Sequence, residues 1–114
     1  MQDDLITHRD IEGYIMGMPG VAIDYPFGES AAVYKIHDKM FALIAENKIP
    51  VRISLKCDPQ LSKVLQEKYE TVMPGYHLNK KHWITVVLTG QLPLDEVKGL
   101  ITHSYSLVTG DAKS

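Results

Sequence analysis

One stretch of strict alternation, residues 51–57, constrains the fold more than any other feature of the chain. Because successive side chains of a β-strand point to opposite faces, this segment has one apolar and one polar side. The apolar side consists of Val51, Ile53, Leu55 and Cys57, and the polar side of Arg52, Ser54 and Lys56. A strand with a single apolar side is typical of a sheet whose second face is not packed into the core. The segment therefore predicts an antiparallel sheet covered by helices on one face.

Capping signals place helices on both sides of this strand. Asp58-Pro59 directly follows it and supplies an N-cap residue and a proline at the first helical position. Near the N-terminus, Thr7-His8-Arg9-Asp10 resembles a capping box with aspartate in the place of glutamate, and Pro19-Gly20 ends the helix behind it. Pro93 opens a third helix, with apolar residues at helical spacing up to Val108.

The remaining segments predict further strands. Residues 31–37 alternate, and residues 40–45 are apolar on both sides, as in a central strand; Asp38-Lys39 is the expected turn between them. Residues 83–89 form a strand, with a short extended piece near residues 72–74, and the segment after Gly20 is interpreted as a loop. The expected order is α-β-β-β-α-β(β)-α, an α+β fold in one domain over residues 1–114.

Charge and composition limit the classes of partner. The formal net charge is −2, and Arg9 and Arg52 are the only arginines, so DNA binding would need a local basic patch. No apolar run approaches the length of a membrane span, and the acidic start Met1-Gln2-Asp3-Asp4 does not resemble a signal peptide. The single cysteine cannot form an internal disulfide. We therefore expect a cytoplasmic protein without a membrane partner.

A basic and aromatic surface is the main functional candidate. If the strands at 51–57 and 83–89 are neighbours, their polar sides place Arg52, Lys56 and Trp83 on one open face, with the polar segment before Trp83 at its rim. Cationic and aromatic side chains on a sheet suit phosphates and bases. The candidate nucleic-acid-binding residues are Arg52, Lys56, His77, Asn79, Lys80, Lys81, His82 and Trp83.

Each of these residues also has a purely structural interpretation. Asn79 and His82 could hold the loop by hydrogen bonds to its backbone, and a tryptophan that begins a strand is commonly packed and half-buried. The two lysines of the loop could simply be solvated. The sequence favours the structural interpretation for Asn79, His82 and Trp83, and Lys80 and Lys81 remain the residues to test for binding.

No catalytic site, metal site or cofactor motif is predicted. The five histidines, His8, His37, His77, His82 and His103, do not have the close spacing of zinc motifs. Cys57 alternates with the apolar side of its strand and is expected to be buried. If it were exposed, the adjoining helix N-terminus would lower its thiol pKa.

Four segments, in this order, resemble the MmcQ/YjbR family of small bacterial proteins. The strongest is Tyr76-His77-Leu78-Asn79-Lys80-Lys81-His82-Trp83 before a Thr-Val strand. The others are Tyr34-Lys35-Ile36 with Lys39-Met40-Phe41-Ala42-Leu43, Ser54-Leu55-Lys56-Cys57-Asp58-Pro59, and a first helix ending Met18-Pro19-Gly20. One departure is Ile36-His37-Asp38, where the family pattern has a more glycine-rich turn.

The resemblance implies an α+β architecture similar to the type III secretion chaperones, which is also compared with the frataxin-like fold. Members are often labelled DNA-binding, and no enzymatic activity comes with the resemblance. We therefore expect a small non-enzymatic protein that binds double-stranded DNA. The alternative is a protein-interaction or chaperone-like module that uses the open sheet face or a dimer interface. A third and weaker hypothesis is an enzymatic role around His77, His82 and Cys57. The sequence does not define the oligomeric state.

Overall fold

The computed structural model describes residues 7–26, 28, 30–45, 50–75 and 78–110. Nine elements follow one another along these residues. They are α1 (His8–Met16), β1 (Val21–Asp24), β2 (Ala31–Ile36), β3 (Lys39–Ala45), β4 (Arg52–Lys56), α2 (Pro59–Lys68), β5 (Val72–Pro74), β6 (Trp83–Val87) and α3 (Leu94–Thr109).

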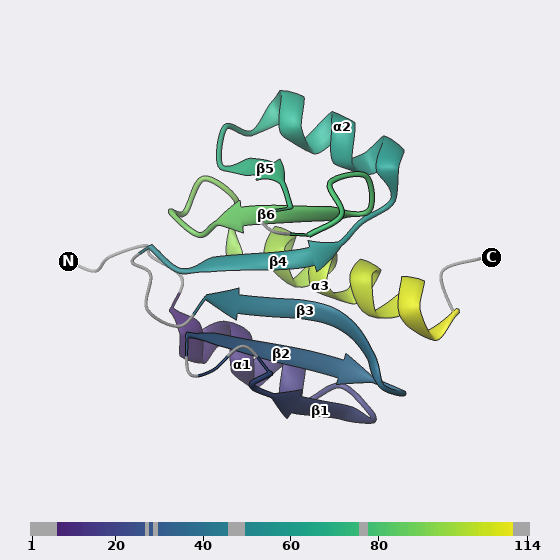
Figure 1. The fold of residues 1–114 in the computed structure, drawn as a ribbon. Helices are drawn as coiled ribbons and strands as arrows, with labels where there is room; N and C mark the ends of the chain where they lie inside the picture. The colour runs from purple at the N-terminus through teal and green to yellow at the C-terminus, as the bar shows by residue number, and fades with distance from the viewer. Residues whose placement is uncertain (1–6, 27, 29, 46–49, 76–77, 111–114) are drawn as a thin grey trace.

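The strands form one six-stranded sheet in the order β1-β2-β3-β4-β6-β5, and each neighbouring pair is antiparallel. Figure 1 shows the sheet face-on, with β1 at one edge and β5 at the other. β4 therefore pairs with β6, although α2 and β5 lie between them in the chain. This pairing brings the segment before Trp83 to the end of the alternating strand.

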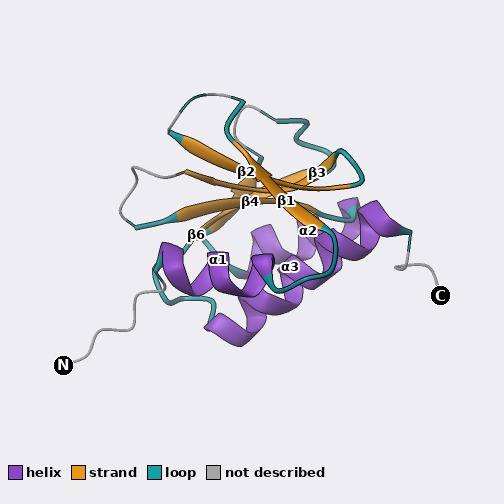
Figure 2. Cartoon of the chain, turned by 90° about the horizontal axis from the view of Figure 1, so that it is seen from below, coloured by secondary structure: helices purple, strands orange, loops and turns teal. Residues whose placement is uncertain are grey.

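The helices leave one face of the sheet without a helical cover. Figure 2 shows α1 and α3 below the sheet and the connecting loops on its other side, while α2 packs against β5. The predicted α+β fold with helices on one face is confirmed. We refer to the side of the sheet opposite α1 and α3 as the loop face.

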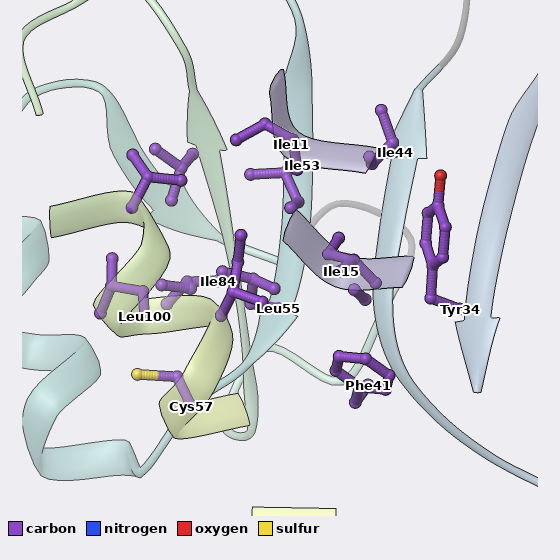
Figure 3. Close-up of a cluster of buried hydrophobic side chains, with 14 of the residues drawn as sticks. Ile11, Ile15, Tyr34, Phe41, Ile44, Ile53, Leu55, Cys57, Ile84 and Leu100 are labelled. Carbon is purple, nitrogen blue, oxygen red and sulfur yellow. The ribbon is translucent and has the colours of Figure 1, made fainter. Parts of the chain in front are cut away.

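The core lies between the sheet and the two helices. Ile11 and Ile15 of α1 and Ile101 of α3 are fully buried against Ile53 and Leu55 of β4. Figure 3 shows Ile11, Ile15, Ile53 and Leu55 among the labelled side chains of this buried cluster. The inward set predicted from the alternation of residues 51–57 is therefore the observed one.

The capping predictions for the first two helices are also confirmed. Thr7 and Asp10 form a reciprocal capping box at α1: the Asp10 N–H donates to Thr7 Oγ1 (3.2 Å), and the Thr7 N–H donates to Asp10 Oδ2 (3.0 Å). Asp58 Oδ2 accepts hydrogen bonds from the N–H groups of Gln60 and Leu61 at the start of α2. These local signals fix where the helices begin because they satisfy backbone donors that have no partner inside the helix.

The sequence interpretation was wrong about the segment after Gly20. This segment contains the edge strand β1, so the order is α-β-β-β-β-α-β-β-α. Four residues are too few for alternation to distinguish a strand from a loop, and β1 is defined by its pairing with β2.

The β2–β3 turn and one face of α2 also differ from expectation. The turn consists of His37 and Asp38, both with left-handed φ angles of 54° and 64°, and not of Asp38 and Lys39. Two successive positive φ angles match the twist of a two-residue hairpin without requiring glycine. Val64, expected in the apolar stripe of α2, is exposed.

Candidate nucleic-acid interface

The register between β4 and β6 places the predicted residues on a common side. Lys56 is the cross-strand partner of Trp83, Ser54 of Thr85, and Arg52 of Val87. Because opposed residues of an antiparallel pair point to the same face, all of them lie on the loop face, away from α1 and α3. The arrangement expected from the two alternating segments is therefore present.

The centre of this face is closed, contrary to the expectation of an open platform. Ser54, Thr85 and Trp83 are 5%, 3% and 6% exposed. The hydroxyls of Ser54 and Thr85 lie 2.8 Å apart and hydrogen-bond each other across the strands. An indole ring this buried has no free face on which a base could stack, so Trp83 is a packing residue in this structure.

Asn79 shapes the loop before Trp83. Its Oδ1 accepts a hydrogen bond from the Lys81 N–H (2.9 Å), and its backbone carbonyl accepts one from the His82 N–H (3.2 Å). A side-chain oxygen that takes the N–H two residues later is the usual role of asparagine in a turn. The structural interpretation of Asn79 accounts for its contacts.

Lys80 is also partly engaged within the protein. Its Nζ donates to the carbonyl of Gly75 (3.2 Å), and the Gly75 N–H donates to the carbonyl of Trp83 (3.0 Å). An ammonium group has three donors, so one contact to a carbonyl leaves donors for another acceptor. Lys80 therefore joins the loop to the end of β5 and still carries an exposed charge.

Lys81 and His82 are exposed, and their backbone is anchored by the strand that follows. The Cys57 N–H donates to the His82 carbonyl (2.9 Å), which extends the β4–β6 pairing by one residue. This bond fixes the loop beside Lys56 and leaves both side chains in solvent. His77, another predicted residue, lies outside the described residues.

Two residues of α3 position the end of β4, and the sequence carried no signal for either. The Lys56 N–H donates to Ser104 Oγ (3.0 Å), and the Asp58 N–H donates to His103 Nε2 (3.2 Å). Both contacts join segments more than forty residues apart in the chain. Alternation and capping report only on local neighbours, so a contact of this kind follows from the tertiary fold alone.

The predicted cations form two groups rather than one patch. Lys56, Lys80 and Lys81 belong to the end of β4 and the loop that packs there; we call these three residues the lysine end. Arg52 begins β4 four residues earlier, a separation of about 13 Å along a strand, with the buried Ser54 between. Among the described residues, Lys35 forms an ion pair with Asp24 (3.3 Å), and His8 Nδ1 lies 3.6 Å from Glu12 Oε1. Within that part of the chain, neither Arg52 nor the lysine end has a carboxylate partner.

Nothing in the described part of the chain supports Cys57 as a nucleophile. It is a free thiol with 2% exposure, and burial, followed by the charge of Asp58, raises its pKa to about 11. The expectation that the helix N-terminus would lower this pKa applied to an exposed thiol and does not hold for the buried one. No group of three potential metal ligands occurs among the described residues.

None of the helices that the structure describes is long and apolar enough to cross a bilayer. The longest of them, α3, packs its buried side chains into the core of the protein.

Comparisons with known proteins agree with this fold. Residues 16–107 match the YjbR family model. The chain is 38% identical to the protein YbdF of Escherichia coli O157:H7 over 93% of its own length and 87% of that protein. It is 34% identical to YjbR of Escherichia coli K12, over 88% of this chain and 85% of that protein.

Solved structures extend the agreement to the tertiary fold. The crystal structure of the Deinococcus radiodurans protein DR2400, of the DUF419 domain family, superposes with a TM-score of 0.87 at 34% identity. The match covers 100% of this chain and 86% of that one. A Pseudomonas syringae protein gives a TM-score of 0.77 at 30% identity, with coverage of 90% and 98%. Sequence, fold and element order together show that the chain belongs to the YjbR (DUF419/MmcQ) family.

Proposed function

We propose that the protein is a non-enzymatic domain that binds double-stranded DNA weakly, through phosphate contacts made by the lysine end and, separately, by Arg52. The observation that carries this proposal is the β4–β6 register. It sets Lys56 beside the loop that bears Lys80 and Lys81, and no described carboxylate neutralises them. Trp83 and Asn79 hold this loop in place and do not contact the ligand.

The expected binding is dominated by charge. Phosphate contacts position a protein on DNA but carry no sequence information, so we expect little preference for sequence. Each phosphate neutralised contributes about −0.9 to the slope of log affinity against log salt. With few contacts and a net charge of −2, binding should be detectable at low salt and be lost near physiological ionic strength.

A charge-matched pair of double variants tests the assignment. Lys56→Ala with Lys81→Ala removes two charges from the lysine end, whereas Arg9→Ala with Lys98→Ala removes two from α1 and α3 on the opposite side of the molecule. Fluorescence anisotropy with a labelled duplex at low salt should show weaker binding for the first pair only. Equal effects of the two pairs, or no binding by the wild type, would contradict the proposal.

A protein partner is the second candidate, supported by the acidic net charge and by half-buried apolar side chains on the loop face. Leu43 and Val87 lie there beside Ser54 and Arg52. Capture from lysate with and without nuclease separates the candidates. A captured protein that survives nuclease treatment and fails to bind a Leu43→Asp variant supports the protein partner, and loss of the captured material on nuclease treatment supports DNA.

A further inference from the structure

The two edges of the sheet are protected differently. β5 has three residues, ends in Pro74 and is packed against α2. β1 has four residues and no proline, lysine or bulge, and no described element lies on its outer side. Figure 1 shows β1 as the outermost strand, with its edge facing away from the rest of the sheet. An edge strand that no other element covers presents backbone donors and acceptors that can pair with another strand.

Apolar side chains accompany this edge. Val21 and Ile23 point to the helix side and are half-buried, while Ala22 and Asp24 are exposed on the loop face. Three large hydrophobic side chains are exposed in the described part of the chain: Tyr25 at 45%, which directly follows β1, Met16 at 41%, which ends the preceding helix α1, and Val64 of α2. Within the described residues, the outer side of β1 therefore has no strand partner and lies beside apolar surface, as a strand-pairing interface requires.

We propose that β1 pairs antiparallel with β1 of a second copy of this chain, about a two-fold axis that passes through Ala22. This register sets Ala22 opposite the partner's Ala22 and Val21 opposite the partner's Ile23. Facing residues then point to the same side, so the helix layers of both copies lie on one side of a continuous sheet. Both copies also direct their loop faces the same way.

The charges and the neighbouring turn favour this register. Asp24 lies opposite the partner's Gly20, so the two carboxylates stand at opposite ends of the interface, and each has its own Lys35 as an ion-pair partner (3.3 Å). A register shifted towards Tyr25 is less suitable because its backbone is already engaged. The Tyr25 N–H donates to Asp24 Oδ1 (2.8 Å), and its carbonyl accepts from the Gly28 N–H (3.1 Å).

A second copy fits this edge because the strand complements itself. Ala22, the smallest side chain of β1, lies at the axis, where two identical residues must face each other. On either side of the axis, Val21 of one copy faces Ile23 of the other. A four-residue ladder buries far less surface than a stable permanent interface. The dimer should therefore be weak and dependent on concentration, and it does not rest on the proposed DNA binding.

Like charges placed at the axis provide the test. Ala22→Glu sets two carboxylates face to face only in the dimer, and within one chain the new carboxylate lies beside Lys35, the cross-strand partner of residue 22. Like charges directly opposed on neighbouring strands are destabilising, so sedimentation should show dimerisation weakened at least severalfold. Gln60→Glu adds the same charge on α2 and should leave dimerisation unchanged.

Mixing variants makes the test specific to the axis. Ala22→Lys alone should also weaken self-association, and an equimolar mixture with Ala22→Glu should restore dimers, with thermal unfolding verifying that each variant is folded. Hydrogen exchange should slow at β1 amides as wild-type concentration rises. A wild type that stays monomeric up to millimolar concentration, or an Ala22→Glu variant that dimerises like Gln60→Glu, would overturn the proposal.

Discussion

At the residue scale, the hydroxyl of Ser104 links α3 to two neighbouring strands. Ser104 Oγ accepts from the Lys56 N–H and donates to the Phe41 carbonyl, at the point where the recorded β3–β4 pairing stops with Ala42 and Leu55. The side chain is fully buried. One hydroxyl thus satisfies a donor and an acceptor that would otherwise lack partners in the interior.

Ser104→Ala should therefore destabilise the protein more than the loss of one oxygen suggests. Leaving a buried donor or acceptor unsatisfied costs about 1–3 kcal/mol, and this variant leaves one of each. We expect a loss of about 2–4 kcal/mol in urea denaturation. Ser106→Ala, on the same helix and only partly buried, is the control; equal losses in the two variants would show that the bridge has no special role.

In the His37–Asp38 turn, by contrast, a substitution is predicted to stabilise the protein. Both residues hold left-handed φ angles that are costly for side chains other than glycine. Asp38→Gly should relieve that strain and raise the free energy of unfolding by up to about 1 kcal/mol, as measured by chemical denaturation. A clear loss of stability would mean that the Asp38 side chain stabilises the turn by more than the strain costs.

At the scale of elements, Gly75 packs closely against Trp83 at the start of β6, beside the loop that bears Lys80 and Lys81. A Cβ at this position would lie 2.6 Å from the Trp83 Cβ and 3.2 Å from the Trp83 carbonyl oxygen. Gly99 of α3 has open space where its Cβ would be. The two glycines therefore serve different purposes, since only the first is required by its surroundings.

The same substitution at the two glycines should have effects of opposite sign. Gly75→Ala should cost about 1–3 kcal/mol through overpacking and shift the emission of the only tryptophan, whereas Gly99→Ala should stabilise α3 by up to about 1 kcal/mol. Thermal and urea unfolding followed by tryptophan fluorescence measure both. An unchanged emission spectrum in Gly75→Ala would argue against the tight packing of Trp83.

Local signals explain which elements could be predicted. The capping groups of Thr7 and Asp58 and the alternation of residues 51–57 act over a few residues, so they specify α1, α2 and β4 from sequence alone. β1 was missed because four residues carry too little periodicity. The adjacency of β4 and β6 was only a conditional inference, since the pairing depends on how α2 and β5 cross between them.

At the scale of the whole molecule, the sequence predicts which face of the sheet carries the candidate residues, but it does not predict which of those side chains are exposed. Alternation placed Arg52, Lys56 and Trp83 on one side, and the strand register agrees. Burial of Trp83 and the contact of Lys80 with Gly75 depend on how loops fold against the sheet, which no periodicity encodes. Burial removes Trp83 from the residues that could contact a ligand, and the lysine end and Arg52 are the ones that we propose bind DNA.

The salt dependence of duplex binding tests the central claim most directly. Anisotropy titrations of a labelled duplex over a series of salt concentrations should give a linear log–log plot for the wild type. The Lys56→Ala, Lys81→Ala double variant should have a slope shallower by about 1.8, because two phosphate contacts are lost. A wild type that does not bind at low salt, or a double variant with the wild-type slope, would contradict the assignment of DNA binding to the lysine end.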